Sequence, residues 1–302
     1  MASPGCQWYK LKIYLVVPQL TGPPLGSGKT TLLALLTGDH PQSYTQAHLY
    51  LPSLATASSS SQSGTSPPTV HDYTLRPRKK TPTAHLRTLV GVVSPEMFDA
   101  FPRRHPGMNI WEAVGTGFNG GFVPRNRGAT TKSSVGWVDV DDDELGSGWY
   151  NLSVSEMEAR RREIRKWRVG RCWEVINALG PASWWNPSPS SPFPSYLKAL
   201  PYQLRKEPSP ESVPFASTAF SSISPGEQRL VLLMRALVGR PPLVLLDEAW
   251  SGMDEAMIAA ARRYLRGDLI NGIEEDQAVV VITHWEDEVP WVGEEVKKFR
   301  LD

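Results

Sequence analysis

The stretch Thr21-Gly22-Pro23-Pro24-Leu25-Gly26-Ser27-Gly28-Lys29-Thr30-Thr31 decides the fold class of this chain. It follows an apolar, strand-like run at 11–17 and opens a helix-like run at 30–36. A glycine-rich turn between a strand and a helix cradles phosphate, because backbone N–H groups and the helix dipole both favour an anion there. Lys29 is expected to reach the β- and γ-phosphates, and Thr30 to place its hydroxyl on Mg²⁺. The predicted nucleotide-binding residues are Gly22, Gly26, Ser27, Gly28, Lys29, Thr30 and Thr31.

This loop departs in one respect from the usual spacing of phosphate-binding loops. The G-x-x-x-x-G-K-[ST] pattern requires glycine at position 23, where this chain has Pro23, and the glycine stands one place earlier at Gly22. The predicted loop is therefore one residue longer. An ordinary glycine- and proline-rich surface turn before a helix is the alternative interpretation of the loop taken alone.

The composition limits the class of protein. A chain of 302 residues has room for one or two domains, and 32 Lys+Arg against 31 Asp+Glu gives no overall field for nucleic acid or an anionic membrane. The two cysteines are too few for a disulfide framework, and no apolar run reaches the length of a membrane span. We predict a cytoplasmic protein without direct nucleic-acid binding, and a mitochondrial location stays open without support from an arginine-rich start.

Short apolar strands alternate with helical segments along the chain. A capping box at Ser153 and Glu156 and a stop at Gly180 delimit the longest helix. We expect strands at 48–51, 89–93, 243–246, 278–282 and 296–301, and helices at 109–114, 154–179, 226–238 and 255–265. Such an alternation predicts an α/β fold whose mainly parallel sheet is covered on both faces.

Other segments lack the pattern of a packed element. Residues 52–82 are rich in Ser, Thr and Pro around a basic cluster at 76–80, which predicts a disordered insertion. Residues 181–213 are a Pro- and Ser-rich loop by the same criterion. The acidic run at 139–144 and the arginine-rich face of the helix at 154–179 are both predicted to be solvated.

A pair of carboxylates supplies the expected chemistry. The apolar strand at 243–246 ends in Asp247 and Glu248, and in a phosphate-loop enzyme we expect this strand beside the one that feeds the loop. Asp247 would then bind Mg²⁺, directly or through water, and Glu248 would polarise the attacking water. The alternative is an apolar strand that ends in two acids by chance.

The segment Ser222-Ile223-Ser224-Pro225-Gly226-Glu227-Gln228-Arg229 resembles the signature L-S-G-G-Q-Q-R of the ATP-binding-cassette (ABC) ATPases. The resemblance continues through Ser251-Gly252-Met253-Asp254, similar to the D-loop, and through Val279 to His284, where a strand delivers the switch histidine. It implies a P-loop NTPase fold, with an ABC-type nucleotide-binding domain at 11–302. A helical subdomain is implied at roughly 96–238.

The same resemblance implies roles for single residues. Glu248 and His284 would be catalytic, with His284 on the γ-phosphate and the water, and Thr30 and Asp247 would hold the metal. The signature residues Ser224, Gly226 and Glu227 would meet an ATP held by a partner cassette, and Asp254 would communicate across that interface. ATP and Mg²⁺ are therefore the expected ligands. A second cassette, identical or different, is the expected partner, and a transmembrane partner stays open.

Several positions depart from the family pattern. Pro225 and Glu227 replace a glycine and a glutamine of the signature, and Ser94-Pro95-Glu96 stands where a glutamine is expected. The family normally has an aromatic residue before the loop that stacks on adenine, and here Trp8 or Tyr9 could take its place. The segments at 38–44 and 93–96 look like the soluble photorepair or molybdate-transport-type subgroup, whose fungal members often carry two cassettes. The short region before the loop therefore suggests a second cassette or an incomplete gene model.

Three functions remain open at this level. The leading one is an ATPase cassette that works as a dimer. The second is a nucleotide-responsive interaction module that binds ATP with negligible turnover, which the long loop, Pro225 and the missing glutamine favour. The third is a small-molecule kinase, which would have no use for the signature or the D-loop.

Overall fold

The computed structural model describes residues 12–16, 28–54, 73–78, 81–102, 107–124, 135–145, 149–184, 206–267, 272–274, 277–285, 288–291 and 296–300. Several predicted site residues lie outside these ranges: Trp8, Tyr9, Gly22, Gly26 and Ser27. The backbone of Lys29 and Thr30 is described, but their side chains are not.

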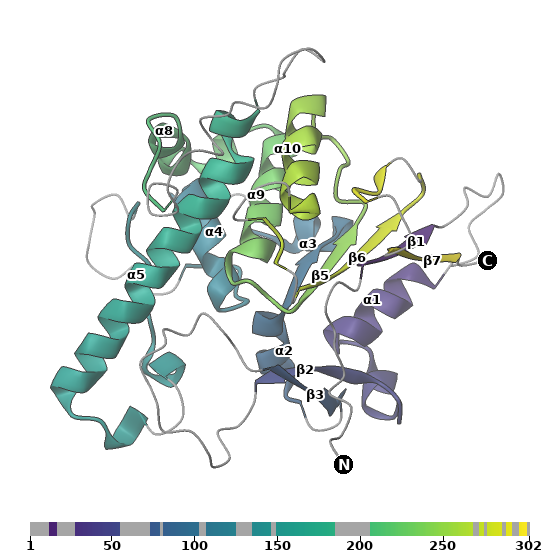
Figure 1. Ribbon diagram of the computed structural model, residues 1–302, viewed down its shortest axis with the longest axis horizontal. Coiled ribbons are helices and arrows are strands. Elements are labelled where there is room, and N and C mark those ends of the chain that lie inside the picture. The colour runs from purple at the N-terminus through teal and green to yellow at the C-terminus, as the bar shows by residue number, and fades with distance from the viewer. Residues whose placement is uncertain are drawn as a thin grey trace.

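A parallel sheet forms the centre of the molecule (Figure 1). Its strand order is β4-β5-β6-β1-β7, and each neighbouring pair runs parallel. The strands span Lys12–Val16 (β1), Val90–Val93 (β4), Leu243–Asp247 (β5), Ala278–Thr283 (β6) and Val296–Arg300 (β7). The predicted α/β class with a mainly parallel sheet is confirmed.

Helices cover both faces of this sheet, because its strands are apolar on both sides. Val244 and Leu246 of β5 join the large core with helices α9 (Pro225–Val238) and α10 (Glu255–Arg266). Leu245, between them, turns to the opposite face and packs with Leu33 of α1 (Lys29–Thr37). The alternation of side chains along a strand thus divides the core between the two faces.

A group of helices extends the large core away from the sheet (Figure 1). The capping boxes Ser153/Glu156 and Asn109/Glu112 start α5 (Val154–Leu179) and α4 (Ile110–Gly115). Trp111 of α4 and Trp173 of α5 pack with ring centroids 4.6 Å apart. The further helices are α2 (Thr83–Leu89), α3 (Pro95–Ala100) and α8 (Ser212–Ser217). Short 3₁₀ turns lie at Pro41–Tyr44, Thr116–Phe118, Asp142–Leu145, Trp149–Asn151, Pro181–Ser183 and Phe220–Ser222.

The predicted disordered insertion at 52–82 has ordered ends. Strands β2 (Tyr50–Leu54) and β3 (Tyr73–Pro77) pair antiparallel into a second, small sheet. Arg78, from the basic cluster, is fully buried and donates to Gly38 O at 3.0 Å and to Tyr44 Oη at 2.8 Å. The amino-acid composition did not predict these ordered ends, because they have no apolar core of their own. Backbone pairing of β2 with β3 and hydrogen bonds from Arg78 to neutral acceptors hold them. Residues 55–72 lie outside the described ranges.

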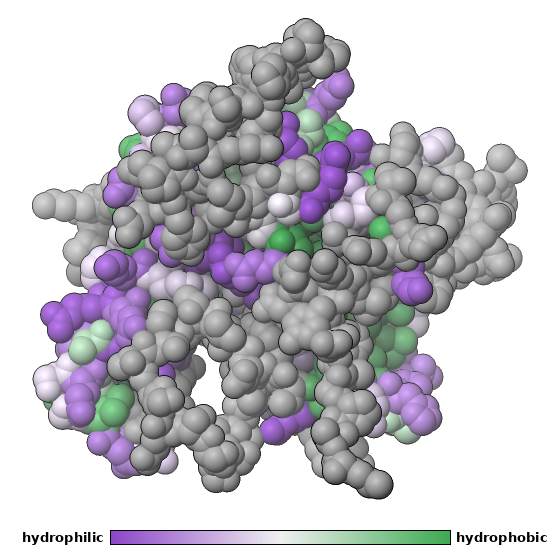
Figure 2. Space-filling view, viewed as in Figure 1, coloured by the Kyte–Doolittle hydropathy of each residue, from purple (hydrophilic) through white to green (hydrophobic). Residues whose placement is uncertain are grey.

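The acidic run and the basic helix face, both predicted to be solvated, pair with each other. Arg168 of α5 donates to both oxygens of Glu144, at 2.9 and 3.0 Å, and Arg161 forms an ion pair with Asp142. Arg168 is 6% exposed, so this face of α5 is solvated only in part. Hydrophilic surface still dominates where the first turns of α5 lie, at the lower left of Figure 2. Sequence periodicity locates a charged face but does not show which loop folds onto it.

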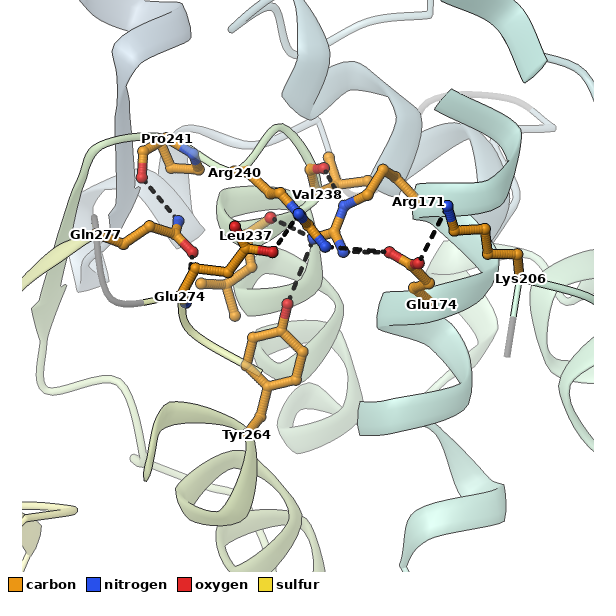
Figure 3. Close-up of polar contacts among 10 residues, drawn as sticks. All are labelled: Arg171, Glu174, Lys206, Leu237, Val238, Arg240, Pro241, Tyr264, Glu274 and Gln277. Atoms are coloured by element: carbon orange, nitrogen blue, oxygen red, sulfur yellow. Dashed lines mark hydrogen bonds and ion pairs between the residues drawn. The ribbon is translucent and has the colours of Figure 1, made fainter. Parts of the chain in front are cut away.

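A buried ionic cluster fixes the turn between α9 and β5 (Figure 3). The carboxylate of Glu174 on α5 is fully buried and pairs with Arg171, one helical turn earlier. Arg171 also donates to the carbonyls of Leu237 and Val238, both at 3.3 Å, where α9 ends. A cation at the C-terminal end of a helix is favourable because the last carbonyls carry partial negative charge.

Arg240, in the turn itself, extends the cluster to the strand β6. Its guanidinium lies 3.8 Å from Glu174 and forms an ion pair with Glu274. Gln277, directly before β6, donates to Pro241 O at 2.8 Å (Figure 3). The turn that joins the signature helix to the strand with the acidic pair is therefore held from both sides.

No helix within the described ranges is long and apolar enough to cross a membrane. Among the same residues, no group of three His, Cys, Asp or Glu side chains is placed to hold a metal ion.

Candidate functional site at the carboxyl edge of the sheet

The ends of three neighbouring strands form the candidate site. In the register of the sheet, Asp247 of β5 lies opposite Ile282 of β6, and Thr283 of β6 lies opposite Val16 of β1. The carboxyl ends of β5, β6 and β1 therefore lie side by side. Ligands of open α/β sheets bind outside this edge, where the loops leave the strands.

The strand order corrects one prediction from the sequence. We expected β5, with its two acids, to lie beside β1, which leads into the phosphate loop. Instead β6 lies between them, because crossover connections in a parallel sheet can skip a position. The consequence is that His284, which follows β6, stands between the acidic pair and the end of β1.

The helix α1, which follows the predicted phosphate loop in the sequence, begins as predicted. Gly28 is the N-cap of α1, has φ +73° and is exposed. A positive φ favours glycine, which explains why glycine occupies the N-cap position of this helix. Thr31, also predicted to bind nucleotide, is exposed in the first turn. The predicted roles of these residues and of Lys29 and Thr30 stay predictions.

Glu248 and His284 meet at the carboxyl edge. His284 Nε2 lies 3.2 Å from Glu248 Oε1, and the two side chains are 26% and 39% exposed. Glu248 has φ +45°, a sparsely populated conformation for a residue with a side chain. Two hydrogen bonds hold it, from Glu248 N to Ile282 O at 3.1 Å and from Ser251 N to Glu248 O at 3.3 Å. A carboxylate beside an imidazole, both open to solvent, has the groups that general base catalysis needs.

Asp247 is placed differently from its neighbour. It ends β5, and it is only 5% exposed. Of two adjacent acids, one is thus buried at the strand end and the other reaches solvent. This division fits the two separate roles that the sequence predicts for them.

Glu288 is a residue of this site that the sequence did not indicate. Thr283 donates a short hydrogen bond to the carboxylate of Glu288 and accepts one from Trp285 N at 3.1 Å. These bonds hold the turn that carries His284. A glutamate in an irregular loop after a strand has no period or spacing that would have revealed this contact.

The predicted signature residues Ser224 and Glu227 form a capping box at the start of α9. Glu227 N donates to Ser224 Oγ at 3.3 Å, and Ser224 N donates to Glu227 Oε2 at 2.8 Å. Gln228 Nε2 donates to the carbonyls of Phe220 and Ile223, which fixes the preceding turn. Contact of these residues with a partner's ATP stays a prediction. The polar groups that such a contact would use already form the hydrogen bonds of the capping box.

Gly226 brings the signature segment against the D-loop segment. A Cβ atom at Gly226 would lie 2.2 Å from Gly252 O and 3.2 Å from Met253 Cα. Asp254, further along the D-loop segment, caps α10 by accepting from Met257 N at 2.8 Å. The two segments, predicted to act at one interface, therefore touch within the chain.

We expect Gly226→Ala to destabilise the protein by about 1–3 kcal/mol, because the added methyl group forces the Gly252 backbone to move. Urea unfolding monitored by tryptophan fluorescence measures the change. Gly115→Ala is the matched control, since a Cβ at Gly115 meets nothing within 4 Å. Equal stability of the two variants would contradict the close packing of Gly226 against Gly252.

Comparisons with known proteins agree with the motifs. No protein-family model matches the chain. The chain is 46% identical over 70 residues to the ABC transporter ATP-binding protein C323.04 of Schizosaccharomyces pombe, which covers 23% of this chain and 14% of that protein. It is 24% identical over 266 residues to the ABC transporter ATP-binding protein YDR061W of Saccharomyces cerevisiae, which covers 88% of this chain and 33% of that protein.

A bacterial relative shows the same kind of match. The chain is 40% identical over 72 residues to the ABC transporter ATP-binding protein ModF of Escherichia coli, covering 24% of this chain and 14% of that protein. This chain thus spans at most 33% of the length of these three relatives. It resembles the ABC transporter ATP-binding proteins, fungal ones included, as its motifs predicted.

Proposed function

We propose that this chain is an ABC-type ATPase cassette, which binds ATP and hydrolyses it to ADP and phosphate. The observation that carries the proposal is the contact of Glu248 with His284 at 3.2 Å, at the sheet edge where β1 also ends. Glu248 accepts the proton of the attacking water, and His284 orients that carboxylate and the water. Lys29 and the loop backbone hold the phosphates.

Mg²⁺ fits the donor set of this edge. Asp247 offers a buried carboxylate. In the sequence, Thr30 follows the predicted phosphate loop and carries a hydroxyl. Mg²⁺ prefers oxygen ligands of these kinds. When bound, the ion would neutralise charge on the phosphates. The residues of the chain supply the base and the positioning.

A second cassette completes the site in this proposal. Ser224 and Pro225 are exposed at the start of α9, where they can face the nucleotide of a partner, identical or different. The domain boundaries 11–302 and 96–238, a cytoplasmic location, and the absence of nucleic-acid binding stay predictions. Transport and non-transport roles both remain compatible with this proposal.

The second candidate is a module that binds ATP with negligible turnover. The observation in its favour is the capping box of α9, in which the side chains of Ser224 and Glu227 each accept a hydrogen bond from the other residue's backbone N–H. In addition, Pro225 has no N–H to offer to a phosphate, and the carboxylate of Glu227 disfavours an anion at this helix end.

Phosphate release from Mg-ATP, measured across a range of protein concentrations without any other substrate, separates the two candidates. The ATPase proposal predicts turnover per molecule that rises with concentration, and no turnover in Lys29→Ala. If wild-type protein is silent but Mg-ATP raises its melting temperature, and Lys29→Ala loses that shift, the module is correct. If the wild-type protein shows no turnover and Mg-ATP does not raise its melting temperature, both candidates are overturned.

A further inference from the structure

A cavity lies apart from the acidic pair, between the first helix and the edge strand β4. Its volume is about 440 Å³, and it is bounded by α1, α2, β4, α3 and the turn at 120–122. Leu33, Leu86, Val92, Met97 and Phe122 give it mainly apolar walls. A volume of this order is typical of sites for small organic molecules.

One buried cation lines this apolar cavity. Arg235 of α9 is 6% exposed, and its guanidinium donates to Thr116 Oγ1 at 2.9 Å, to Gly121 O at 2.7 Å and to Met97 Sδ at 3.8 Å. All three acceptors are neutral. Burial lowers the pKa of Arg235 to about 10, and the group still carries its charge at neutral pH. Of the five N–H groups of a guanidinium, these bonds use three.

Two other buried arginines of the helical part have a carboxylate partner, whereas Arg78 resembles Arg235 in donating to neutral acceptors. Arg168 has Glu144 at 2.9 Å, and Arg171 has Glu174. Burying a charge without a counter-ion is costly, so a ligand that supplies the counter-ion is favoured at such a site. The charge of Arg235 has no such compensation among its described acceptors.

The other charged residues among the described lining of the cavity, Asp39, Arg87 and Glu96, are exposed at its rim. Arg87 and Asp39 are 4.0 Å apart and their side chains are 65% and 56% exposed. Glu96 is exposed in the first turn of α3. Two phenyl rings flank the guanidinium carbon of Arg235, with centroids at 5.2 Å for Phe122 and 5.8 Å for Phe101. Among the described lining residues, the interior of the cavity thus combines one cation with apolar and aromatic surface.

We infer that this cavity binds a small organic monocarboxylate, with its carboxylate on Arg235 and its apolar body against α1, α2 and β4. A carboxylate supplies the missing counter-charge and accepts the two unused N–H groups of the guanidinium. A more strongly hydrated dianion would lose more solvation in these apolar walls than one guanidinium returns. The inference is independent of ATP turnover.

Isothermal titration calorimetry of the full chain with octanoate, 1-octanol and octylammonium tests the inference. These probes share one apolar chain and differ in charge. We expect saturable binding of octanoate at one site, binding of octanol weaker by about tenfold or more, and no binding of octylammonium. Equal binding of octanoate and octanol, or no saturable binding of octanoate, would overturn the inference.

Two variants locate the site. Arg235→Gln is expected to abolish the preference for octanoate over octanol. Because loss of a buried arginine can prevent folding, Ala34→Leu provides a second variant, which fills the cavity from α1 and keeps the charge. Ala34→Leu should abolish octanoate binding, whereas Val213→Ala, an exposed position on α8, should leave it unchanged. Octanoate binding that survives Ala34→Leu would show that the carboxylate binds elsewhere and would overturn the assignment.

Discussion

Glu248→Gln is expected to lower the rate of phosphate release by about 10²–10⁴-fold, the range typical for loss of a general base. The substitution keeps the shape of the side chain and can keep a hydrogen bond to His284, but it removes the basic oxygen. Because the Glu248 side chain is 39% exposed, its neutralisation should leave the fold intact. A phosphate-release assay at saturating Mg-ATP measures the rate.

The control for this variant is Glu255→Gln, which neutralises an exposed acid in the first turn of α10. It should retain the wild-type rate. Stabilisation by Mg-ATP should persist in Glu248→Gln, since binding does not need the base. If Glu248→Gln releases phosphate at the wild-type rate, Glu248 is not the base, whatever the control does.

Glu174→Ala is expected to destabilise the protein by about 3–5 kcal/mol, the range for breaking a buried ion pair. The substitution leaves Arg171 buried against α9 without its carboxylate, and Arg240 loses one of its two acids. Urea unfolding measures the loss as a lower midpoint at unchanged slope.

The same helix provides a matched control for Glu174→Ala. Arg161 and Glu158 form a pair at the same three-residue spacing, but the Glu158 side chain is 52% exposed. We expect Glu158→Ala to cost at most about 1 kcal/mol, as for other surface pairs. A loss of similar size in both variants would contradict the structural role of the buried cluster.

Much of the fold could be predicted because its local signals agree with its tertiary structure. The apolar runs at 243–246 and 278–282 form β5 and β6, and Ser153, Glu156 and Gly180 mark the bounds of α5. These signals depend on neighbouring residues only. They need no knowledge of which segments meet.

The parts that could not be predicted depend on long-range pairing. The position of β6 between β5 and β1 is a property of the crossovers, which the strands themselves do not encode. The burial of Arg78 and the pairing of Arg168 with Glu144 likewise join segments far apart in the chain. For the candidate site, the sequence indicated Glu248 and His284, but not Glu288, whose loop has no recognisable pattern.

The place of β1 in the sheet has a consequence for how the chain folds during synthesis. Both of its neighbours, β6 and β7, come from residues 278–300, whereas β1 comes from residues 12–16. Until residues 278–300 have been made, β1 has neither of these partners, and contacts between such distant segments form slowly. Backbone groups of β1 therefore stay unpaired while the residues between are synthesised, and the part of the sheet that bears the site can form only after β6 and β7.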